Sequence, residues 1–230
     1  MMVSKLALLT AAGGLLSGVC GVSGQFNGDD QDMIVPACPH WSMVLWQNPV
    51  PKDDNTTFPR THTTMCYDKT SIHLNFTALD EKDFHFNASQ GNNDPIWQYS
   101  VMEAFIALGE DDPATYLEFE VNPNNVTFQA IIYNPSKVRD EPMDTAFLGI
   151  PFPTATEIDK KTEYWNSYTR IPLGLFNLDS KTVKGTKWRM NFFRTVTSNA
   201  SFPEQLLGAW KPTPKANFHM TPYFGRVMLD

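Results

Sequence analysis

The sequence has no cluster of lysine and arginine residues, and its 25 acidic side chains outnumber the 18 basic ones over 230 residues. Proteins that bind nucleic acid use such clusters to neutralise phosphates, so we exclude nucleic acid as a partner. The motifs His-Glu-x-x-His and Gly-x-Ser-x-Gly and glycine-rich phosphate loops are also missing from the sequence. Their absence removes the usual signatures of zinc proteases, serine hydrolases and nucleotide-binding proteins.

Long hydrophobic runs are scarce. The run from Leu6 to Val19 is too short and too rich in glycine for a membrane span. It follows Lys5 and precedes the small residues Gly21, Ser23 and Gly24, which is the pattern of a secretory signal peptide. We therefore expect residues 1–24 to be removed and the protein to be extracellular, with no membrane span.

Cysteine is also rare. Cys20 lies in the expected signal peptide, so removal of that peptide leaves only Cys38 and Cys66. In an oxidising compartment an isolated pair is expected to form a disulfide. By the chain-entropy account, this bond would stabilise the fold by roughly 3 to 4 kcal/mol.

Sequons for N-glycosylation are more numerous than chance would give in a chain of this size. Asn-x-Ser/Thr without a central proline occurs at five positions: Asn55, Asn75, Asn87, Asn125 and Asn199. Asn134 is excluded because Pro135 follows it. These sequons predict a secreted eukaryotic glycoprotein that carries all five asparagines on its surface.

No Ser/Gly-rich linker or internal repeat divides the chain, so we expect one domain over residues 38–230. Residues 25–37 are polar and predict a loose N-terminal arm. Within this arm, residues 27–32 resemble a calcium loop faintly but lack the later bidentate glutamate.

Alternation of apolar and polar residues with a period of two indicates strands. It occurs over residues 71–76, 97–108, 115–121, 126–133, 186–193 and 223–229. Residues 121–125 supply the turn chemistry of a hairpin, and the charged, proline-rich run 135–164 is expected to be an irregular insertion over one edge. Many short strands predict two packed antiparallel sheets, an all-β sandwich of the jelly-roll type.

Glu103 is the clearest polar outlier, because the expected strand 97–108 places it between Val101 and Phe105 on the face that also carries Trp97. A carboxylate in this position must be paired, hydrogen-bonded or directed at a ligand. Two interpretations remain open: an ion pair with Arg189 or Arg194, or an acceptor for sugar hydroxyls beside an aromatic platform.

Two further segments carry candidate binding residues. Arg189 and Asn191 alternate with Trp188, which we expect in the core, and both suit hydrogen bonds to vicinal hydroxyls. A solvated outer face explains them equally well. Trp210 lies on a loop stiffened by prolines and is either an aromatic platform or a core residue that covers the end of the sandwich.

Three segments resemble motifs of the family 9 carbohydrate-binding modules and their DOMON-like relatives. They are Ala-Trp-Lys-Pro-Thr with the later Asn-Phe-His and Phe-Gly (209–225), Trp-Gln-Tyr-Ser-Val-Met-Glu-Ala-Phe (97–105) and Trp-Arg-Met-Asn-Phe-Phe-Arg (188–194). The resemblance covers residues 65–229. It implies that Trp97 and Trp210 stack on a sugar as an aromatic sandwich and that Glu103 accepts hydrogen bonds from its hydroxyls. Ser100 stands where the family usually has an acid.

The resemblance implies a non-catalytic protein that binds extracellular or wall-derived sugars, in carbohydrate catabolism alongside glycoside hydrolases, and it suggests calcium as a structural cofactor. Two other functions stay open. A glycosidase acting on O-glycosyl bonds would need paired carboxylates, for which Glu103 with Glu118 or Glu120 is the available choice. A haem-binding electron-transfer domain, as in some DOMON relatives, would draw its ligands from Met102, Met190, Met220 and His219.

Overall fold

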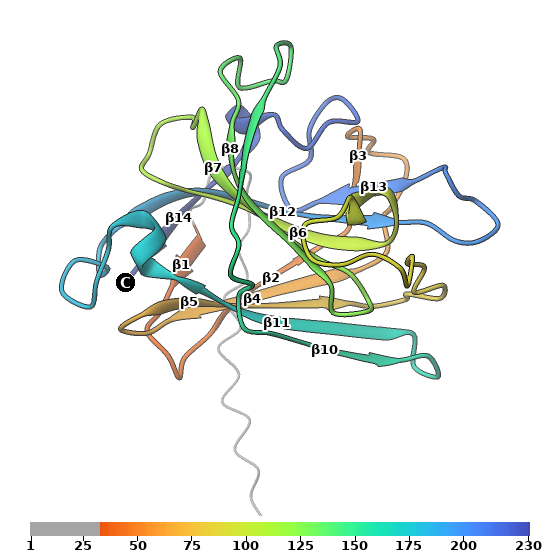
Figure 1. Ribbon diagram of the computed structural model, residues 1–230, viewed down its shortest axis with the longest axis horizontal. Helices are drawn as coiled ribbons and strands as arrows, with labels where there is room; N and C mark the ends of the chain where they lie inside the picture. The colour runs from red at the N-terminus through yellow and green to blue at the C-terminus, as the bar shows by residue number, and fades with distance from the viewer. Residues whose placement is uncertain (1–32) are drawn as a thin grey trace, which may run out of the picture.

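The computed structural model describes residues 33–230, which form two β-sheets packed face to face as a sandwich, and this confirms the expected fold class (Figure 1). The larger sheet has nine strands. Seven of them lie side by side in the order β1 (Met33–Val35), β14 (Gly225–Leu229), β12 (Lys187–Val196), β6 (Val101–Leu108), β7 (Thr115–Val121), β8 (Thr127–Tyr133) and β9 (Asp144–Phe147). The other two are β13 (Leu206–Ala209), which pairs with β12, and β3 (Asn48–Val50), which pairs with β13.

The smaller sheet contains five strands in the order β10 (Thr154–Asp159), β11 (Tyr164–Pro172), β5 (Ser71–Ala78), β4 (Thr61–Tyr67) and β2 (Ser42–Trp46). Three short 3-10 helices complete the described elements: η1 (Ile96–Gln98), η2 (Leu173–Phe176) and η3 (Thr221–Tyr223). Within residues 33–230, none of the helices has the length and apolar character needed to cross a membrane.

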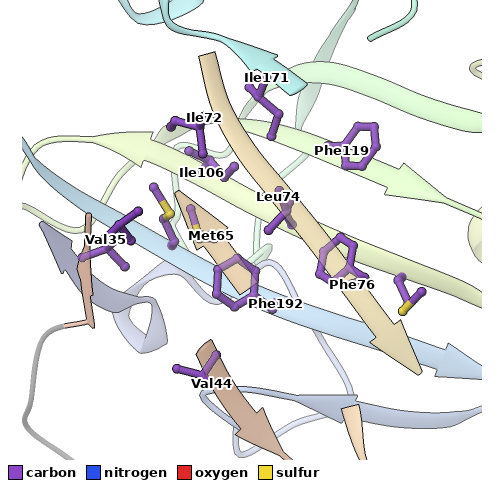
Figure 2. Packing of buried hydrophobic residues seen from close by; sticks show 14 of the residues in the cluster. Val35, Val44, Met65, Ile72, Leu74, Phe76, Ile106, Phe119, Ile171 and Phe192 are labelled. Carbon is purple, nitrogen blue, oxygen red and sulfur yellow. The ribbon is translucent and has the colours of Figure 1, made fainter. Parts of the chain in front are cut away.

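The main core lies between the two sheets and is made by alternate residues of their strands. Leu74 and Phe76 of β5 point from the smaller sheet toward Phe119 and Phe192 of the larger one (Figure 2). The rings of Phe76 and Phe192 meet edge to face at 6.2 Å. Trp188 is buried in the same cluster, as its alternation on β12 predicts.

A second apolar cluster covers the opposite, outward face of the larger sheet. Its members include Phe105 of β6, Tyr116 of β7, Phe128 of β8, Phe193 of β12 and Phe224 beside β14. Strands that are apolar on both faces have to be covered on both sides. Loops therefore close over this outward face, and they create the walls of the cleft described below.

Strands β2, β3, β4, β11 and β13 form where the sequence analysis expected none, and three expected segments differ in the structure. The strand over residues 97–108 begins only at Val101, because residues 96–98 form η1 directly after Pro95. The run 135–164 is not wholly irregular: β9 extends the larger sheet and β10 pairs with β11 in the smaller one. Residues 33–35 of the expected loose arm form β1, which pairs in parallel with β14.

Other expectations lie outside the described residues or are confirmed. The expected signal peptide (1–24) and the faint calcium loop (27–32) fall outside residues 33–230. The hairpin at residues 121–125 joins β7 to β8 in antiparallel pairing. In its turn the Oδ1 atom of Asn122 accepts hydrogen bonds from the amides of Asn124 and Val126.

The disulfide between Cys38 and Cys66 is present, with an S–S distance of 2.04 Å and Cα atoms 5.2 Å apart. Cys66 is buried in β4, whereas Cys38 follows an isolated parallel bridge between Ala37 and Tyr67. The disulfide therefore holds the segment that follows β1 against strand β4 of the smaller sheet.

None of the five sequon asparagines is buried. Asn55, Asn125 and Asn199 are exposed, while Asn75 on β5 and Asn87 are partly exposed. We expect enzymatic removal of N-glycans to lower the apparent mass of the protein on a gel. Peptide mass spectrometry should then find aspartate at Asn55, Asn125 and Asn199, and unmodified asparagine at all three would contradict the expectation.

A buried ion pair ties β12 to the segment that follows β5. The side chains of Arg194 and Glu81 are fully buried, and Nη2 of Arg194 lies 2.9 Å from Oε2 of Glu81. Nη1 of Arg194 also donates to the carbonyl of Leu79 and the hydroxyl of Thr61. The pair therefore closes one end of the main core and does not involve Glu103.

Candidate functional site

A cleft of about 300 Å³ opens on the outward face of the larger sheet. Strands β6, β7, β8 and β12 form its floor, and its walls come from the segment 205–219 and from the connection between β8 and β9, which rises away from the smaller sheet in Figure 1. The lining residues that carry the argument below are Trp97, Glu103, Glu118, Phe128, Arg139 and His219.

Trp97 stands at this cleft with 43% of its surface exposed. Helix η1 carries it, and two contacts hold it in place. Its ring meets Phe128 edge to face with centroids 5.2 Å apart, and Nε2 of Gln205 donates to its carbonyl oxygen at 2.7 Å. An exposed indole on a fixed backbone offers a flat apolar surface to a ligand.

Three glutamates gather below the cleft, and the strand register explains why. Glu103 of β6 is directly opposite Glu120 of β7, and Glu118 lies two residues before Glu120 on the same face. All three are buried, and one carboxylate oxygen from each lies within 4.8 Å of the others. Glu103 and Glu118 line the cleft.

Burial governs the ionisation of this cluster. It raises the pKa of Glu103 and of Glu120 well above the ordinary value, and repulsion between the neighbouring carboxylates adds to the effect. Burial raises the pKa of Glu118 to about 7, while the positive charge of Arg139 acts in the opposite direction. At neutral pH the cluster therefore retains protons that free glutamates would have lost.

His219 is part of the same site. Its Nδ1 atom and the hydroxyl of Tyr116 share a hydrogen bond of 2.6 Å, and its Nε2 atom lies 4.0 Å from Oε1 of Glu118. Burial, assisted by the charge of Arg139, lowers the pKa of His219 to about 3. The imidazole is therefore neutral, and its approach to Glu118 is not an ion pair.

The structure brings Trp97 and Glu103 together at the cleft but not the other candidate binding residues. Arg189 shares the outward face of β12, yet its guanidinium pairs with Asp112 at 2.9 Å and donates to the carbonyl of Pro222. Asn191 donates to the carbonyl of Lys211 at 2.8 Å and accepts from its amide at 3.0 Å. Both side chains are buried and hold loops, so neither a ligand contact nor a solvated face describes them.

Trp210 lies on the other side of the larger sheet from the cleft. Its ring stacks on the inward-facing Phe192 with centroids 5.4 Å apart, and a Cβ atom at Gly225 would lie 2.5 Å from the indole. Trp210 packs against the main core. Trp97 and Trp210 therefore do not form the expected aromatic sandwich. Of the two interpretations of Trp210, platform or core residue, the structure shows the core residue.

The sheet also separates two of the haem ligands considered from the sequence, Met102 and Met190, from His219, while Met220 is buried directly after His219 in the chain. Met102 and Met190 are buried in the main core on the inward face, whereas His219 lies at the outward cleft. The glycosidase carboxylates, by contrast, do come together. Arg139 and Gln205 carried no sequence signal that marked them for the site, because long-range packing alone brings their loops to it.

The fold and the cleft define a class: a β-sandwich protein with an aromatic residue and buried carboxyls in a cleft on its larger sheet. No protein-family profile matches the chain. Over 234 aligned residues it is 47% identical to a protein of Arthroderma benhamiae named Extracellular protein, and the match covers 98% of each chain. The chain belongs to the same family as that protein.

Solved structures of low sequence identity share the fold. A candidate carbohydrate-binding protein from Bacteroides uniformis is 16% identical over 82% of this chain and 87% of its own, with a TM-score of 0.61. A family 9 carbohydrate-binding module from Caldicellulosiruptor kristjanssonii, in complex with cellotriose, is 15% identical over 87% of this chain and 94% of its own, with a TM-score of 0.53. The structure of a module of this family from the same organism in complex with glucose has a TM-score of 0.55 and covers 87% of this chain and 96% of its own.

Proposed function

We propose that this protein is a secreted, non-catalytic carbohydrate-binding protein whose ligand lies in the cleft on the larger sheet. The observation that carries the proposal is the exposed indole of Trp97 beside the buried carboxyls of Glu103 and Glu118 in one cleft. Carbohydrate recognition combines an aromatic surface for the C–H face of the sugar with a few fixed polar groups for its hydroxyls.

Each residue has a distinct role in this proposal. Trp97 stacks on one face of the sugar ring. Glu103 and Glu118 accept hydrogen bonds from hydroxyls when ionised and donate one when protonated. Arg139, at the wall, donates from a fixed fork of N–H groups. The single platform replaces the aromatic pair that the family resemblance implied.

The comparisons support secretion and the class of ligand. The relative from Arthroderma benhamiae is named an extracellular protein, and the Caldicellulosiruptor modules of similar fold were solved with cellotriose and glucose. We therefore propose that the ligand is an extracellular or wall-derived glycan, met during carbohydrate catabolism alongside glycoside hydrolases. A glycan array with the secreted protein is the broadest test, followed by calorimetry with glucose and cellotriose.

The substitution Trp97→Ala is expected to weaken glycan binding about tenfold to a hundredfold, because it removes the stacking surface without opening the main core. Trp41→Ala is the matched control, since Trp41 is 41% exposed, precedes β2 of the smaller sheet and lies outside the cleft. Calorimetry measures the glycan affinity of both variants. Equal affinities for the wild type and Trp97→Ala would mean that Trp97 does not contact the glycan.

Hydrolysis of an O-glycosyl bond is a second candidate, favoured by the pairing of Glu103 and Glu118 in the cleft and by the pKa of about 7 for Glu118. Retaining glycosidases place an acid and a nucleophile about 5 Å apart. Incubation with cello-oligosaccharides followed by chromatography tests this function. Product formation that is lost in Glu118→Gln supports catalysis, and unchanged oligosaccharides leave binding as the function.

A further inference from the structure

The buried side chain of Glu120 has no ordinary hydrogen-bond donor. Neither of its oxygens accepts a hydrogen bond from an N–H or hydroxyl group in the described part of the chain. Among the described residues, only the carboxyl of Glu118 lies in hydrogen-bonding contact, and in that contact Glu120 holds the proton and donates it to Glu118. A buried carboxylate normally has a positive partner or several donors. This pocket presents Glu120 with two further acids instead.

We propose that Glu103, Glu118 and Glu120 bind a divalent metal cation at the floor of the cleft. The proposal goes beyond sugar binding, because the ion site stands whether or not the cleft accepts a glycan. It would explain why three acids converge on a buried point that two neighbouring strands define.

The spacing of the donor atoms suits one ion. Metal–oxygen distances of roughly 2.1 to 2.6 Å allow two ligand atoms on opposite sides of an ion to lie about 4 to 5 Å apart. The three carboxylate oxygens lie within 4.8 Å of one another, and Nε2 of His219 is 4.0 Å from Oε1 of Glu118. The three carboxylates can therefore reach a common centre, while His219 stands beside Glu118 at the edge of this group.

The surroundings of the three ligands are fixed. His219 stands beside Glu118, and its Nδ1 atom shares a hydrogen bond of 2.6 Å with the hydroxyl of Tyr116. The ring of Phe105 lies 5.0 Å from the imidazole, so the site has an apolar wall. Glu103 and Glu118 line the cleft and give an ion a path from solvent.

The chemistry of the ligands selects among cations. Carboxylates suit Ca²⁺, Mg²⁺ and Mn²⁺. Three carboxylates therefore favour one of these ions, and Mn²⁺ is the probe of choice, with Ca²⁺ as the second ion to titrate.

The test uses the full secreted protein after treatment with EDTA and dialysis. Titration calorimetry with Mn²⁺ is expected to give one site per chain, and the melting temperature should rise with Mn²⁺ concentration. Glu120→Gln keeps the shape of the side chain and should weaken Mn²⁺ binding about a hundredfold, while Glu157→Gln, an exposed acid on β10, should leave it unchanged.

The outcome separates the metal site from the sugar site. Glu120 is not among the cleft-lining residues, so Glu120→Gln should still bind glycan if the proposed function holds. Absence of both a heat signal and a melting shift with Mn²⁺, Zn²⁺ and Ca²⁺ in the wild type would overturn the metal site alone. Equal Mn²⁺ affinity in the wild type and Glu120→Gln, or an equal loss in Glu157→Gln, would also overturn it.

Discussion

In buffer that contains a chelator, the free energy of unfolding is expected to fall by about 3 kcal/mol between pH 5 and pH 8. Glu118 loses its proton near pH 4.5 when unfolded and near pH 7 when folded. Between these values the folded protein binds more protons than the unfolded chain, so stability declines as the pH rises. Glu103 and Glu120, whose pKa values are also raised by burial, act in the same direction.

Urea unfolding at pH 5, 6, 7 and 8 measures this dependence. Glu118→Gln removes the titrating group but keeps its size, so the decline should become shallower, whereas the exposed Glu157→Gln should leave it as in the wild type. The contribution of Asp68 to the pH dependence of stability has the opposite sign. Its folded pKa is lowered to about 2 by hydrogen bonds, so its contribution is lost only as the pH falls below 4. Constant stability from pH 5 to 8 would mean that the three acids are hydrated.

The substitution Arg194→Met is expected to destabilise the protein by about 3 to 5 kcal/mol, because it leaves the carboxylate of Glu81 buried without its cation. Glu81 is fully buried, and its Oε1 atom accepts hydrogen bonds from the amides of Asp83 and Phe84. These amides cannot replace the charge of the guanidinium. Chemical denaturation of the purified variant gives the loss directly.

A matched exposed pair provides the control. Arg60 and Asp80 form an ion pair of 3.1 Å, but both side chains are about half exposed. Arg60→Met should therefore cost far less stability than Arg194→Met. In the Arg194→Met background, Glu81→Gln should restore part of the lost stability, since it removes the unpaired charge. Similar costs for Arg60→Met and Arg194→Met would refute the assignment of the buried pair.

The sequence predicted the sandwich because the information needed for it is local. Phe76, Trp188 and Phe192 alternate with polar neighbours, and a period of two indicates which side of each strand meets the core. Tight turns such as that at Asn122 are likewise encoded within a few residues. The disulfide could be predicted because only Cys38 and Cys66 were expected to remain after signal-peptide removal.

The candidate site was predictable only in part, because it depends on pairing between distant strands. Glu103 is conspicuous as an acid in an apolar strand, but only the register that places it opposite Glu120 reveals a cluster. Arg189 has the chemistry of a sugar ligand, and only the loops packed over it show that its guanidinium is already engaged. The face on which Trp210 packs is set by the bend of a loop, which no periodic pattern reports.

The parallel pairing of β1 with β14 constrains how the protein forms during synthesis. Met33 pairs with Val227, so β1 has no partner in its final place until β14 has been synthesised. Pairing across nearly the whole chain makes loop closure slow. The edge of β1 must therefore remain unpaired while translation proceeds, a period in which chaperones have access to it.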